Sequence, residues 1–220
     1  MIVPRARTTD VISIVTFATF LLATVTRETD RIALFAGFIP ARVHALAAEG
    51  IVVDVPWLPV WLTPLTATLV HGSWLHVGLN LMILIFCGRQ VEHLLGTARL
   101  IILYVLGAYA AALGHWLSAP ESMAPMIGAS GAISAVIGAY ALIYSRSEVR
   151  AIGPIPAQAV RILWLAAGWT VLQVMIGFAG LGMGGPVGSV AIWAHVGGFI
   201  AGLLLARPLL SSRFRSRRPH

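Results

Sequence analysis

Residues 128–145 read GASGAISAVIGAYALIYS, an uncharged and mostly apolar run that contains Ser130 and many small side chains. A run of this length predicts a helix that crosses a membrane. A second apolar run, residues 190–206, contains His195 in the stretch WAHVGG at 193–198. Polar side chains are costly inside a bilayer and usually mark functional positions there. Ser130 and His195 are therefore the first candidate functional residues.

The composition indicates an integral membrane protein. Of the 220 residues, 58% are hydrophobic and only 10% are charged, whereas a soluble domain carries about 25% charged residues. This length has room for several spans but for no separate soluble domain, so we expect a single membrane domain over residues 1–220. The one cysteine, Cys87, excludes an internal disulfide.

Apolar runs at six positions predict an all-α bundle of six transmembrane helices: 11–26, 73–95, 98–118, 129–145, 158–179 and 190–206. The first run is short and follows Arg5 and Arg7, so a cleaved signal peptide is the alternative there. We favour a retained span, because residues 23–26 offer no convincing small-residue cleavage site.

The arginines predict that both termini are cytoplasmic. With six spans, twelve arginines fall on the inner side and only Arg27, Arg31 and Arg42 on the outer side, in agreement with the positive-inside rule.

The net charge of +7 could suggest a nucleic acid partner. However, the arginines lie just beyond the ends of apolar runs, so we expect no nucleic acid binding. Residues 207–220 are expected to form a basic cytoplasmic tail near anionic lipid headgroups of the bilayer.

Two outer connections differ from the others. The first, residues 27–70, is long and contains charges, prolines and tryptophans, which suits a segment lying in the membrane interface. The last, residues 177–189, is rich in glycine and predicts a mobile loop.

Three polar residues fall at similar depths when each is measured from the arginine that ends its span. Ser130 is sixteen residues from Arg146, or about 24 Å along a helix. His195 lies about 18 Å from Arg207, and His76 about 20 Å from Arg89. In a hydrocarbon core about 30 Å thick, all three lie in the outer half.

These residues have both a catalytic and a structural interpretation. A histidine that takes the serine proton makes the serine a nucleophile, and His76 and Asn80, four residues apart, share a helix face. Both can donate to the oxyanion that forms when serine attacks an amide. The structural alternatives are an interhelical hydrogen bond from His76 and Asn80, and small-residue packing of the two apolar helices without chemistry. No metal site is expected, since the sequence has no H-E-x-x-H motif.

Four motifs in order resemble the rhomboid family of intramembrane serine proteases, and the likeness covers residues 57–206. They are HGSWLH at 71–76 with Asn80, the stretch Gly88 to Gly96 with Glu92, GASG at 128–131, and AHVGG at 194–198 with Gly202. The resemblance implies that Ser130 is the nucleophile and His195 the general base of a dyad. It further implies that His76, Asn80 and the Ser130 N–H bind the oxyanion, with no cofactor.

The implied substrates are single-pass membrane proteins, and the implied location is a bacterial cell (inner) membrane. By the same likeness, residues 27–70 form a membrane-embedded loop and residues 177–189 a flexible cap.

Two other functions remain open from the sequence. One is a non-proteolytic rhomboid-like protein that binds or escorts membrane proteins, although such relatives usually lack the serine or the histidine. The other is a small transporter with His76 and His195 as a proton relay, which would keep its function without Ser130. The absence of a long internal repeat argues against a transporter.

Overall fold

The computed structural model describes residues 6–45, 58–144, 150–164, 166–168 and 192–215. Over these residues the chain is α-helical, as predicted, and its extended pairings are two isolated bridges, Phe38 with Met126 and Ile152 with Ile155. Within the described residues, four helical segments are long and apolar enough to cross a membrane. They are α1 (Arg7–Thr26), the α5–α6 segment (Trp74–Leu95), α7 (Thr97–Ser118) and α10 (Ile192–Arg215).

A fifth predicted span corresponds to the shorter helix α8 (Ser130–Ile143). Its fourteen residues extend about 21 Å, less than a full hydrocarbon core. The predicted span at 158–179 lies mostly outside the described residues, which show helix at 157–164 and 166–168. The count of six spans therefore stays a prediction. The glycine-rich connection, residues 177–189, also lies outside the described residues.

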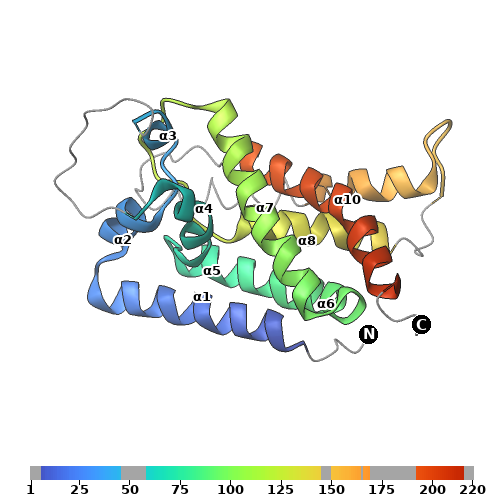
Figure 1. Cartoon of the computed structure of the whole chain (residues 1–220), viewed down its shortest axis with the longest axis horizontal. Coiled ribbons are helices and arrows are strands. Elements are labelled where there is room, and N and C mark those ends of the chain that lie inside the picture. The colour runs from blue at the N-terminus through green and yellow to red at the C-terminus, as the bar shows by residue number, and fades with distance from the viewer. Residues whose placement is uncertain (1–5, 46–57, 145–149, 165, 169–191, 216–220) are drawn as a thin grey trace.

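Helix α8 is enclosed by α7 and α10 (Figure 1). Glycines let the three helices pack closely. A β-carbon at Gly131 on α8 would fall 2.5 Å from Ala111 Cβ on α7. At Gly198 and Gly202, a β-carbon would collide with the backbone carbonyls of Gly131 and Ala135. Small residues thus let the helices approach as the sequence pattern predicts. This close approach places the start of α8 beside the first turns of α10.

The α5–α6 segment contains α5 (Trp74–Ile83), a π-helical turn (Leu84–Gly88) and α6 (Arg89–Leu95). Glu92 on α6 accepts hydrogen bonds from the Thr8 N–H at 3.0 Å, the Thr9 N–H at 2.8 Å and the Thr9 hydroxyl at 2.8 Å. Arg89 forms an ion pair with Asp10 at 2.7 Å. These contacts fix the first turn of α1, which runs alongside α5 in Figure 1.

The first outer segment folds into short helices: α2 (Thr29–Ala36), α3 (Ala41–Ala45), η1 (Val60–Leu62), α4 (Thr63–Thr66) and η2 (Ala67–Leu69). Tyr109 on α7 donates to the Trp61 carbonyl at 2.8 Å and attaches the segment to α7. Within the segment, Arg42 donates to the Leu58 carbonyl at 2.7 Å. Phe38 exchanges backbone hydrogen bonds of 3.0 and 2.8 Å with Met126. The segment is thereby held against the chain that leads into α8.

Helix α10 continues beyond Arg207, where the sequence places the start of a basic tail, and ends at Arg215. Arg99 donates to the Ser212 hydroxyl at 2.8 Å, and Arg213 donates to the His93 carbonyl at 2.7 Å. The first part of the tail is therefore a docked helical extension. The start of α1 and the end of α10 lie at the same end of the bundle (Figure 1).

Candidate active site

Ser130 is the first residue of α8 and is 7% exposed. The backbone before it makes an unusual turn, since Gly128 has a φ of +108°. Such a conformation strains any residue that has a β-carbon. Both amides before the serine are held by residues that precede α5: the Gly128 N–H donates to the Ala67 carbonyl at 2.9 Å, and the Ala129 N–H donates to His71 Nε2 at 3.3 Å. The position of Ser130 therefore depends on those residues as well as on α8.

The structure brings Ser130 and His195 together. His195 Nε2 lies 2.8 Å from Ser130 Oγ, although 65 residues separate them in the chain. His195 is 8% exposed and lies in the first turn of α10. This distance suits a serine hydroxyl that gives its proton to a neighbouring imidazole. When the hydroxyl donates, Nε2 is the acceptor and the ring proton resides on Nδ1.

His76 lies in the first turn of α5, where Ser73 caps the helix by accepting from the His76 N–H at 3.2 Å. Its ring lies against Gly128, because a β-carbon at position 128 would come within 2.6 Å of His76 Nε2. His76 therefore contacts Gly128, which precedes Ser130 by two residues. A ring N–H at this position has the chemistry of an oxyanion donor.

Asn80 follows one turn later on α5 and is 1% exposed. Its Nδ2 donates to the His76 carbonyl at 2.8 Å, and its Oδ1 is buried without a hydrogen-bond partner among the described residues. One Nδ2 hydrogen is therefore committed to the helix, which leaves the second for another acceptor.

From the sequence, His71 is expected only to order the loop that enters the second span, because it lies five residues before His76 and on a different helical face. The structure buries it to 1% exposure, against both the Ala129 N–H and the His76 ring. The signal in the sequence was the position of His71 just before the helix that carries His76 and Asn80. Burial lowers the pKa of His71 to about 3, with a smaller contribution from neighbouring His76.

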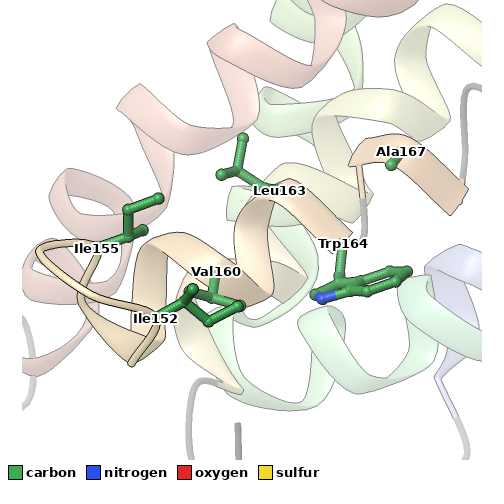
Figure 2. A pocket seen from close by; sticks show the side chains of 6 residues that line it. All are labelled: Ile152, Ile155, Val160, Leu163, Trp164 and Ala167. Atoms are coloured by element: carbon green, nitrogen blue, oxygen red, sulfur yellow. The ribbon is translucent and has the colours of Figure 1, made fainter. Parts of the chain in front are cut away.

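An apolar groove of about 270 Å³ lies elsewhere, between the turn around Gly153 and the helical residues that follow it (Figure 2). Its six lining residues are all apolar: Ile152, Ile155, Val160, Leu163, Trp164 and Ala167. The Trp164 indole N–H is the polar side-chain group of this lining, and the lining holds no nucleophile or base, so the groove is not the candidate site.

The fold and the site together define an α-helical membrane protein with a buried serine–histidine pair. Residues 59–212 match the model of the Rhomboid domain, and the chain belongs to the rhomboid family. It is 36% identical over 137 residues to the rhomboid protease GlpG of Yersinia pestis (strain Pestoides F) and equally to that of Yersinia pseudotuberculosis serotype O:3 (strain YPIII). The identity to the Yersinia enterocolitica protein of the same name is 34%.

The matched region covers 62% of this chain and 44% of each of these relatives, so the chain spans less than half of their length. The apolar helices and the bacterial relatives support a location in a bacterial inner membrane.

Proposed function

We propose that this chain is an intramembrane serine endopeptidase that cleaves transmembrane segments of single-pass membrane proteins. Ser130 is the nucleophile and His195 the general base. The observation that carries the proposal is the 2.8 Å approach of His195 Nε2 to Ser130 Oγ between two buried side chains. Membership of the rhomboid family and relatives named rhomboid proteases support it.

In the first step, Ser130 Oγ attacks the carbonyl carbon of the substrate peptide bond while its proton passes to His195 Nε2. The tetrahedral intermediate then collapses, and His195 returns that proton to the leaving amine. An acyl group remains bound to Ser130. Water next attacks the acyl carbonyl and gives its proton to His195, and the serine leaves with that proton.

The negative oxygen of the tetrahedral intermediate requires donors that are already in place. The Ser130 N–H and the ring N–H of His76 are proposed for this role, because the His76 ring lies against Gly128. The uncommitted Nδ2 hydrogen of Asn80 is proposed as a third donor. A water-poor surrounding strengthens each of these hydrogen bonds.

The proposed enzyme has six spans and both termini in the cytoplasm. Twelve inner arginines against three outer ones support this topology, and so do the hydrogen bonds that both the start of α1 and the end of α10 form with α6. Reporter fusions at Met1 and His220 test it. Both reporters should be cytoplasmic, and an external reporter at His220 would refute the six-span arrangement.

A direct test of the function uses purified full-length protein, a generic single-pass substrate and a serine-directed fluorophosphonate. The wild type should cleave the substrate and bind the probe covalently. Ser130→Ala should do neither, whereas Ser134→Ala, a buried serine one turn further along α8, should still be labelled. A protein that only binds or escorts membrane proteins would show no cleavage, and a transporter would keep its function in Ser130→Ala.

A further inference from the structure

We infer that His71 is a positioning residue that holds the backbone before Ser130 and the His76 ring in their productive orientations. This inference rests on the proposed serine protease function. It concerns a residue outside the proposed Ser130–His195 pair, whose ring accepts a hydrogen bond from the Ala129 amide.

The first support is a pair of consecutive backbone hydrogen bonds. The Gly128 N–H donates to the Ala67 carbonyl at 2.9 Å, and the Ala129 N–H donates to His71 Nε2 at 3.3 Å. Each bond fixes the plane of one peptide group. The next amide along the chain is that of Ser130, the proposed oxyanion donor, and with the two preceding planes held, only the φ and ψ of Ala129 remain to orient it.

The second support is the contact between the two imidazoles. The ring centroids of His71 and His76 are 4.8 Å apart, with the planes inclined at 62°. Behind His76 lies Gly128, where a β-carbon would meet the His76 ring at 2.6 Å. The His76 ring therefore contacts both His71 and Gly128, and these two contacts restrict its rotation.

The third support is the protonation state that these contacts require. Nε2 of His71 accepts a hydrogen bond only when it carries no proton, so the ring must be neutral with its hydrogen on Nδ1. Nδ1 is buried and has no hydrogen-bond partner among the described residues, and the Leu69 backbone raises the pKa of His71 by less than burial lowers it. With its pKa near 3, because of burial and the nearby His76, the ring is neutral at ordinary pH. A protonated ring would present a donor to the Ala129 N–H and would break the bond.

The test compares two substitutions at His71 in the purified full-length protein. Leucine removes the acceptor at similar size, whereas glutamine places an amide oxygen roughly where Nε2 lies. His71→Leu should lower kcat roughly 10–10²-fold with KM nearly unchanged, because oxyanion stabilisation acts in the transition state. The rate of fluorophosphonate labelling should fall by a similar factor. His71→Gln should restore most of both.

Thr68→Val is the matched control, since Thr68 is buried nearby and its hydroxyl donates to the Leu65 carbonyl at 2.7 Å, away from Ser130 and His76. It should change thermal stability but not kcat.

A folded His71→Leu protein with wild-type kcat and labelling rate would overturn the inference. If His71→Leu does not fold, His71→Gln decides: near wild-type kcat supports the inference and a large loss of kcat overturns it. A wild type that neither cleaves nor labels would instead overturn the proposed function.

Discussion

The His76 ring lies so close to Gly128 that a β-carbon at position 128 would fall 2.6 Å from His76 Nε2. Gly128 also has a φ of +108°, which disfavours any larger residue. Two independent constraints therefore require glycine at this position, and both act on the backbone that carries the nucleophile into α8.

Gly128→Ala should lower kcat roughly 10²-fold or more, because a displacement of about 1 Å at catalytic groups has an effect of this size. The measurement is cleavage of a generic single-pass substrate by the purified variant. Gly78→Ala is the control, since a β-carbon at Gly78 on α5 would meet nothing within 4 Å. Equal activity of Gly128→Ala and Gly78→Ala would show that the Gly128 contact has no catalytic importance.

Asn80→Ala should lower kcat by roughly 10–10³-fold without abolishing cleavage, because it removes one of several proposed oxyanion donors. KM should change little, since the interaction forms in the transition state. Steady-state kinetics on one substrate separates the two parameters. A rise in KM alone would assign Asn80 to binding, and unchanged kinetics would leave it only its bond to the His76 carbonyl.

Glu92→Gln should destabilise the attachment of α1. The carboxylate accepts from the Thr8 and Thr9 amides and from the Thr9 hydroxyl, and hydrogen bonds to a charged group contribute about 1.5–3 kcal/mol each. The melting temperature in detergent should fall clearly. Glu28→Gln is the control, because its ion pair with Arg31 is exposed and contributes about 1 kcal/mol or less. Equal effects of the two substitutions would contradict the assigned role of Glu92.

Stability should depend on pH through His71. The unfolded residue takes up a proton below its ordinary pKa of 6.5, whereas burial, with a smaller effect of His76, lowers the pKa of the folded residue to about 3. Its contribution is therefore complete above pH 6.5 and is lost progressively as the pH falls toward 3. Melting temperatures measured across this window should fall less steeply in His71→Gln than in the wild type. Parallel curves would show that His71 does not titrate in this way.

Much of the fold and of the candidate site follows from sequence because membrane chemistry makes polar residues conspicuous. Ser130 and His195 interrupt apolar runs, and small residues predict the close packing that places them 2.8 Å apart. The role inferred for His71 was not predicted, because the bond between its ring and the Ala129 amide joins positions 58 residues apart.

The inner end of α10 is a second difference between sequence and structure. The sequence predicts that the last span ends before Arg207, yet the helix continues to Arg215. Hydrogen bonds of Ser212 with Arg99 and of Arg213 with the His93 carbonyl hold the extension against other parts of the chain. Tertiary contacts of this kind leave no periodic signal in the sequence.

The central claim is that Ser130 and His195 act as one catalytic unit. The most direct measurement is single-substrate cleavage, with fluorophosphonate labelling, by Ser130→Ala, His195→Ala and the double variant in purified, folded form. Each single variant should lose essentially all cleavage, and the double variant should lose no more than either, because the losses of a catalytic pair do not add. Cleavage retained by the purified Ser130→Ala protein would contradict the account.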